Sequence, residues 1–186
     1  MNIFILDRDP VLAAQYQCDS HVVKMVLESA QMLSTAHRVL DGNEVQNYSS
    51  NGRRIKRYIF NDIRDEVVYK AAHINHPCTV WTRQSSANYA WHLKHFNALA
   101  IEFRYRFGKD HSSWLALYDF LKYYPVNIPV GKITSFAHAF TIRNPIAATD
   151  SVDLYRHFYQ EKMHRMSFHY TRRSVPNWLL NLTFNP

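Results

Sequence analysis

Six polar residues recur at alternating steps of three and four between positions 21 and 38, which places them on one face of a helix. They are His21, Lys24, Glu28, Gln31, Thr35 and Arg38. A proton carrier, a cation, a carboxylate and an amide on one narrow stripe are typical of a cleft that performs acid–base chemistry or binds anions. The alternative is an ordinary solvated face on which Lys24 and Glu28 form an i,i+4 ion pair.

A second polar stripe lies on the segment from about 85 to 108. If two helices pack with these stripes facing each other, the stripes line one cleft. The predicted catalytic residues are His21, Lys24, Glu28 and Glu102, and the predicted ligand-binding residues on the stripes are Gln31, Asn88, His92, His95 and Arg106. The alternative is that the second stripe is a solvated helical surface, in which case this cleft does not form.

Further ligand-binding candidates lie outside the stripes. The turn before the second long helix contains His76 and leads to Trp81, and such loops often present functional groups from a rigid scaffold. A capping or core role is the alternative for both residues. Two other segments interleave cations with aromatic residues, a mixture that can stack on bases and neutralise phosphates. Their predicted ligand contacts are Lys109, His111, Arg156 and Lys162.

Several common catalytic templates are absent from the sequence. It has no Gly-rich phosphate loop, H-E-x-x-H, C-x-x-C or G-x-S-x-G, which excludes most nucleotide triphosphatases, common zinc proteases and α/β hydrolases. Cys18 with His21 and His76 with Cys78 resemble a zinc set, but the H-x-C spacing is cramped for two ligands of one ion. We therefore predict buried free thiols, with no metal and no cofactor.

The pattern of apolar residues, caps and breakers predicts the elements that position these residues. We expect helices over residues 10–17, 19–40, 61–73, 85–108, 112–124 and 150–170. Residues 2–6 form either a short strand or a buried extended segment, residues 43–57 a mobile loop, and residues 126–149 an irregular segment. The predicted fold is mainly α, a single-domain helical bundle over residues 1–186.

The composition indicates an anionic partner. The chain of 186 residues has a net charge of +7 and a pI near 9.5, so nucleic acid, a phosphorylated small molecule and an acidic protein all fit. Two cysteines and no leader-like N-terminus predict a cytosolic protein. No apolar run is long enough to cross a membrane, and the oligomeric state is left open.

Motifs spread over most of the chain resemble a family of uncharacterised proteins of tailed bacteriophages. The family pattern has a D-x-D-P start, an H-V-V-K-M helix followed by Glu and Gln, an N-H-P turn before Trp, an E-Y-x-x-R-Y-G-K-x-H segment and a Y-R-x-Y-Y-x-x-x-K helix. The matching segments are 7–10, 21–31, 75–81, 102–111 and 155–162, with departures at Ser20, Phe103, Phe107, His157 and Phe158. The resemblance implies a phage protein in the host cytoplasm and supplies no reaction.

These observations lead to one hypothesis with two alternatives. The first is a phage accessory protein that binds or degrades a nucleotide or other phosphorylated small molecule in a basic pocket between helices, such as a signalling nucleotide of host defence. The second is a base-excision or base-modifying enzyme that acts on DNA, with Lys24 or His21 as nucleophile or base. The third is a protein without catalytic activity that binds an acidic host protein.

Overall fold

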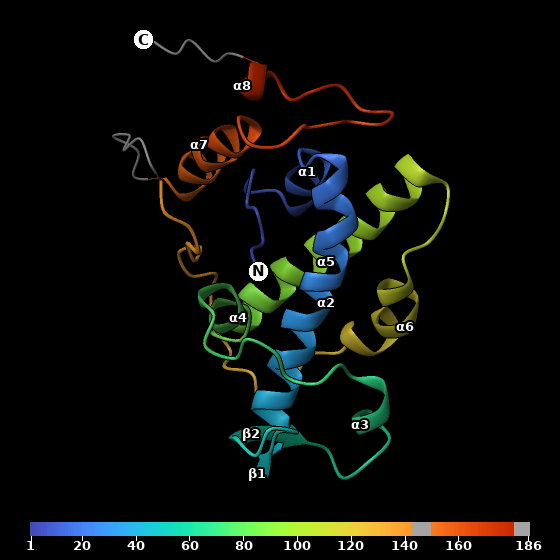
Figure 1. Ribbon diagram of the computed structural model, residues 1–186, viewed down its shortest axis with the longest axis vertical. Coiled ribbons are helices and arrows are strands. Elements are labelled where there is room, and N and C mark those ends of the chain that lie inside the picture. The colour runs from blue at the N-terminus through green and yellow to red at the C-terminus, as the bar shows by residue number, and fades with distance from the viewer. Residues whose placement is uncertain (143–149, 181–186) are drawn as a thin grey trace.

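The computed structural model describes residues 1–142 and 150–180, and its fold is mainly α with one small antiparallel sheet (Figure 1). The helices are α1 (Pro10–Gln15), α2 (Asp19–Asp41), α3 (Arg64–Val67), α4 (Pro77–Thr82), α5 (Ser86–Phe107), α6 (Ser112–Leu121), α7 (Ser151–Met163) and α8 (Asn177–Leu180). The strands are β1 (Asn43–Tyr48) and β2 (Arg54–Ile59).

The helices α2 and α5 pack against each other, as predicted, and α1, α4 and α6 pack against this pair. Both helices are long and bury wide apolar arcs, so their contact forms the centre of the hydrophobic core. The ends of α5 follow local signals. The side chain of Ser85 accepts the backbone N–H of Asn88 at the start, and Gly108 ends the helix with φ of 70°.

The N-terminal residues form a buried extended segment and no strand. Residues 3–6 are almost completely buried against the core, and the Asn2 side chain accepts the backbone N–H groups of Ile3 and Phe4. Phe4 has φ of 53°, a left-handed conformation that is unusual for a bulky residue. The fold therefore holds the Phe4 ring in place through a strained backbone.

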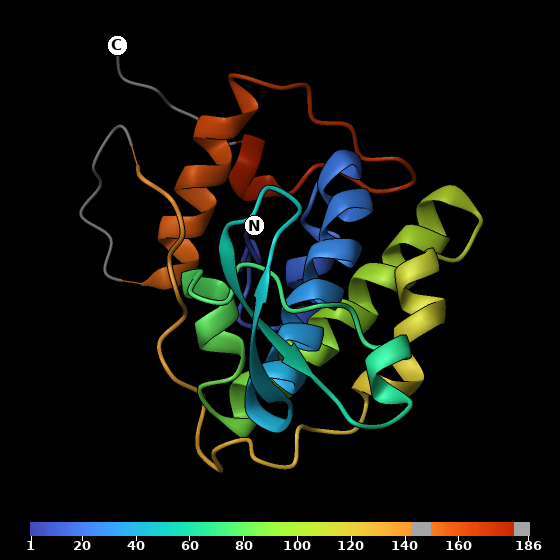
Figure 2. The same cartoon turned by 60° about the horizontal axis from the view of Figure 1, so that its bottom comes forward.

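The segment 43–57, predicted as a mobile loop, is instead mostly a β-hairpin, which crosses in front of α2 in Figure 2. Asn43 pairs with Ile59 and Tyr48 with Arg54. Asn51 and Gly52 lie in the hairpin turn, where Gly52 has φ of 76°.

Two predicted helices are wrong in extent. Residues 61–73 contain only the single turn of α3, because the buried guanidinium of Arg38 binds the carbonyl oxygens of Tyr58, Asp65, Val68 and Tyr69 and holds this segment open. The helix predicted to reach about residue 170 ends at Met163. The turn at 75–77 leads directly into α4, which the sequence did not predict. Of the segment predicted as irregular, residues 143–149 lie outside the described residues.

No helix among the described residues combines the length and the apolar character that membrane crossing requires.

Candidate functional site

The polar stripe of α5 is buried and holds other segments of the chain. Nδ1 of His95 lies 2.9 Å from the carbonyl oxygen of Pro10. Nε2 of the same ring lies 3.3 Å from the side-chain nitrogen of Gln17. Burial lowers the pKa of His95 to about 4, so the ring is neutral at physiological pH. This histidine therefore anchors α1 on α5, and the Gln17 amide in turn donates to the carbonyl of Ile3 in the N-terminal segment at 3.2 Å.

The first turns of α5 have the same structural role. The Asn88 amide donates to the carbonyl of Trp81 and to the hydroxyl of Thr134, each at 2.8 Å. Nδ1 of His92 lies 2.7 Å from the hydroxyl of Thr82, and burial holds the pKa of His92 well below its usual value. Trp81 is buried, with its ring near that of Trp91. The predicted ligand contacts Asn88, His92 and Trp81 thus lie in the core.

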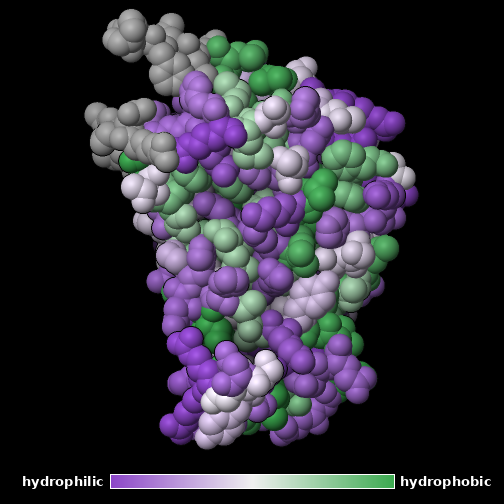
Figure 3. Space-filling view, viewed as in Figure 1, coloured by the Kyte–Doolittle hydropathy of each residue, from purple (hydrophilic) through white to green (hydrophobic). Residues whose placement is uncertain are grey.

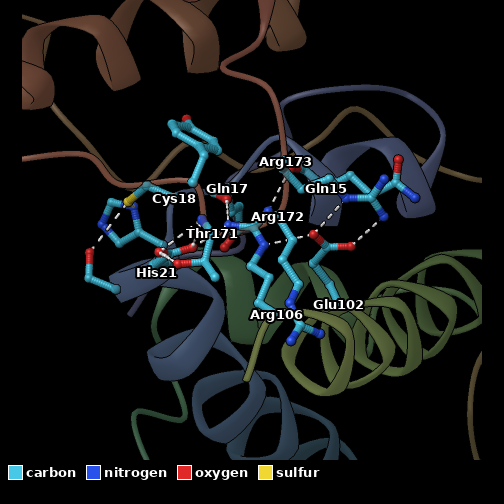
Figure 4. A network of polar contacts seen from close by, with 12 residues as sticks. Gln15, Gln17, Cys18, His21, Glu102, Arg106, Thr171, Arg172 and Arg173 are labelled. Carbon is cyan, nitrogen blue, oxygen red and sulfur yellow. Dashed lines mark hydrogen bonds and ion pairs between the residues drawn. The ribbon is translucent and has the colours of Figure 1, made fainter. Parts of the chain in front are cut away.

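The last turns of α5 form a closed ionic clamp with the start of α2 and the C-terminal segment (Figure 4). Arg106 donates to Glu102 at 2.7 Å and to Asp19 at 2.9 Å, and its two terminal nitrogens also reach the carbonyls of Gln15 and Gln17. Arg173 binds both oxygens of Glu102, at 2.9 and 2.8 Å. The Arg106 side chain is 0% exposed, so no face of it is open to a ligand in this arrangement.

The two stripes therefore meet at one end only. His21 and Cys18 lie beside the clamp in Figure 4, whereas Lys24 and Glu28 have other partners. Glu28 is buried, pairs with Lys24 at 3.2 Å and accepts the backbone N–H of Asn2 at 3.1 Å. Farther along α2, Gln31 is half-buried, while Thr35 and Arg38 bind the segment before α4.

His21 lies in a buried polar contact between α2 and α7. Its Nδ1 atom is 2.8 Å from the hydroxyl of Tyr159 and 3.3 Å from Sγ of Cys18. Since the Tyr159 hydroxyl already accepts the backbone N–H of Cys18, we assign its proton to the bond with Nδ1 and the ring proton to Nε2. Burial, with the charges of Lys162 and Lys24, lowers the pKa of His21 to about 3, so the ring is a neutral donor.

Lys162 of α7 is the half-buried cation next to this contact. Its ammonium lies over the rings of Phe4 and Phe158, 5.8 and 5.6 Å from their centroids. Burial and the charges of Lys24 and Arg165 lower its pKa, although Cys18 acts in the opposite direction. Among the described residues, no carboxylate contacts the Lys162 ammonium.

We call Phe4, His21, Lys24, Phe158 and Lys162 the two-lysine site. Its residues come from the N-terminal segment, α2 and α7, and so from a different pair of helices than the predicted α2 and α5. Three of its members were predicted from the sequence. Phe4 and Phe158 were missed, because an aromatic residue in an apolar or helical pattern shows no sign of the cation above its ring, nor does Phe4 show its positive φ angle.

The remaining predicted residues are dispersed. His76 caps α4 by accepting the backbone N–H of Cys78, and His111 caps α6 in the same way through Ser113. Arg156 binds the carbonyl of Leu6 and the carboxylate of Asp7. Lys109 is exposed after the end of α5. The structure therefore does not bring these four residues into the two-lysine site.

Both cysteines are buried free thiols on different elements. Burial raises the pKa of the Cys78 thiol to about 11, which makes it a poor metal ligand or nucleophile at neutral pH. Within residues 1–142 and 150–180, no group of three or more His, Cys, Asp or Glu side chains is arranged to hold a metal ion. A comparison of the chain with protein families, curated proteins and solved structures finds no match.

Proposed function

We propose that the two-lysine site binds a small anion, and that its ligand is a nucleotide or another phosphorylated small molecule. The observation that carries this proposal is the half-buried ammonium of Lys162, which has cationic neighbours and, within residues 1–142 and 150–180, no carboxylate partner. A desolvated charge next to like charges is unfavourable. A bound phosphate would supply the missing counter-charge and form charge-assisted hydrogen bonds with both lysines.

The neighbouring residues suit an anion as well. Glu28 holds the Lys24 ammonium from one side and leaves this lysine 63% exposed. The neutral His21 ring packs on Phe4 and adds no charge to the site. The strained backbone at Phe4 supports the proposal further, because strained residues are concentrated at functional sites.

Sequestration and breakdown of the ligand both agree with this site. Glu28 is the predicted catalytic carboxylate that lies next to a lysine of the site, whereas Glu102 is held by two arginines. For the alternative, an enzyme acting on DNA bases with Glu28 or Glu102 as its carboxylate, this arrangement leaves Glu28 as the candidate carboxylate. With the resemblance to phage proteins, a signalling nucleotide of host defence is the ligand that we expect.

Two broader expectations belong to this proposal. One hydrophobic cluster includes residues from Ile3 to Leu179, which supports a single helical domain for the chain. The two free thiols agree with a reducing compartment, the host cytoplasm in the case of a phage protein.

Isothermal titration calorimetry with pyrophosphate and ATP as probes tests the proposal. The variant Lys162→Met keeps the length and apolar stem of the side chain, and Lys109→Met removes the same charge from an exposed position outside the site. We expect Lys162→Met to weaken binding by about 1.5 to 3 kcal/mol and Lys109→Met to leave it unchanged. Equal effects of the two variants, or no binding by the wild type, would overturn the proposal.

A further inference from the structure

The hairpin formed by β1 and β2 carries a cluster of cations with few acidic neighbours. Its cations are Arg53, Arg54, Lys56 and Arg57. Glu44 is the acidic residue of the hairpin, and it pairs with Lys56 at 2.7 Å. Arg54 binds the amide oxygen of Gln46, and the guanidinium of Arg53 has no partner among the described residues. The hairpin thus has a surplus of exposed positive charge.

The register of the two strands determines which face of the hairpin each of these side chains occupies. Tyr48 lies opposite Arg54 and Gln46 lies opposite Lys56, so all four side chains share one face of the ribbon. Tyr48 is 67% exposed on that face. Nucleic-acid-binding surfaces often place an exposed aromatic ring beside cations such as Arg54 and Lys56, because the ring stacks on bases and the cations bind phosphates.

A groove runs between β2 and the segment that follows α3. Its volume is about 240 Å³, and it is lined by residues 55–59 of β2 and by Arg38, Asp65, Lys70 and Ala71. Nε of Arg57, in the wall of this groove, is buried without a hydrogen-bond partner within the described part of the chain. A buried guanidinium N–H without a partner is costly, and a phosphate oxygen is a suitable acceptor for it.

We infer that this hairpin binds double-stranded nucleic acid and that its arginines contact the phosphates. The major groove of DNA, about 12 Å wide, admits a two-stranded ribbon. An acidic protein is less favoured, because Arg53 and Arg54 adjoin the hairpin turn, where they can reach the phosphates on both sides of a groove.

The hairpin is separate from the two-lysine site. It lies at one end of the molecule in Figure 1, and α7 lies at the other. The hairpin end is also mostly hydrophilic in Figure 3. Lys24 belongs to the two-lysine site and Arg38 lines the groove beside the hairpin. The distance between them along the axis of α2 is about 21 Å, which indicates how far apart the two sites are. A substitution can therefore abolish binding at one site without affecting the other.

Fluorescence anisotropy with a labelled duplex of about 20 base pairs, and with the matching single strand, tests this inference. The variant Arg53→Ala/Arg54→Ala removes two hairpin charges. The control Arg104→Ala/Lys109→Ala removes two exposed charges near the end of α5, far from the hairpin. It lowers the net charge of the protein by the same amount as the hairpin variant does. Lys162→Met separates this inference from the two-lysine site.

We expect the hairpin variant to bind the duplex at least about tenfold more weakly and to reduce the magnitude of the salt slope by about 2, since each phosphate contact contributes about 0.9. The Arg104→Ala/Lys109→Ala control and Lys162→Met should bind as the wild type does. Equal losses in the hairpin variant and the control, tighter binding of the single strand, or no duplex binding by the wild type would each overturn the inference.

Discussion

The hydroxyl of Tyr159 on α7 lies 2.8 Å from Nδ1 of His21 on α2, and the same hydroxyl accepts the backbone N–H of Cys18. This bond fixes the orientation of the His21 ring, on which the ring of Phe4 packs with 4.4 Å between centroids. The Lys162 ammonium lies over Phe4 in turn. The position of Lys162 in the two-lysine site therefore depends on a hydroxyl that does not itself contact it.

Replacing Tyr159 with Phe removes this hydroxyl and leaves the backbone N–H of Cys18 and Nδ1 of His21 without their partner. We expect the free energy of unfolding to fall by about 1 to 3 kcal/mol, the cost of buried polar groups left unsatisfied. Urea denaturation measures the loss. Tyr123→Phe is the matched control, because Tyr123 is 68% exposed, and a similar loss in both variants would contradict the account.

Arg106→Ala should affect stability more than ligand binding. The substitution leaves the carboxylates of Glu102 and Asp19 without their shared buried cation, and breaking a buried ion pair typically costs about 3 to 5 kcal/mol. Thermal and urea unfolding measure the change, and Arg104→Ala, exposed on the same helix, is the control. A fully stable Arg106→Ala protein that had lost pyrophosphate binding would instead place Arg106 in the ligand site.

The stability of the protein should fall as the pH falls below about 6.5. Burial lowers the pKa to about 3 for His21, about 4 for His37 and about 4 for His95, so these rings stay neutral in the folded state at pH values at which the unfolded chain binds protons. More protons bound in the unfolded state means that stability rises with pH. Each histidine contributes about 1.4 kcal/mol per pH unit between its folded and unfolded pKa values.

Urea denaturation at a series of pH values between about 4.5 and 7.5 checks this dependence. His95→Gln should reduce the slope by the share of one histidine, provided that the variant folds at neutral pH. Stability that stays constant over this range would show that the buried rings are protonated in the folded protein.

The sequence predicted α2 and α5 well, because a long apolar period at helical spacing admits few other structures. Ser85 and Gly108 mark the ends of α5 as expected. The segment 61–73 was not predictable in this way, since the side chain of Arg38, more than twenty residues away, competes for its carbonyl groups. Local propensity contains no information about such a distant donor.

Prediction of the candidate site from the sequence was limited in the same way. The spacing of His92, His95 and Arg106 showed correctly that they share a face, but not that backbone carbonyls and other side chains of the chain itself occupy it. Lys24 and Lys162 belong to different motifs, and only the packing of α7 on the N-terminal segment relates them. A polar stripe in a sequence identifies a buried polar face without saying whether a ligand or the protein fills it.

The pKa of the Lys162 ammonium is the most direct test of the two-lysine site. Titration of the lysine side-chain NMR signals, with Lys162→Met to assign the resonance, gives this pKa with and without pyrophosphate. We expect a pKa below the ordinary value of 10.5 in the free protein and a clear rise when pyrophosphate is bound, because the anion favours the charged form. A Lys162 pKa that is ordinary in the free protein and unchanged by pyrophosphate would contradict the account.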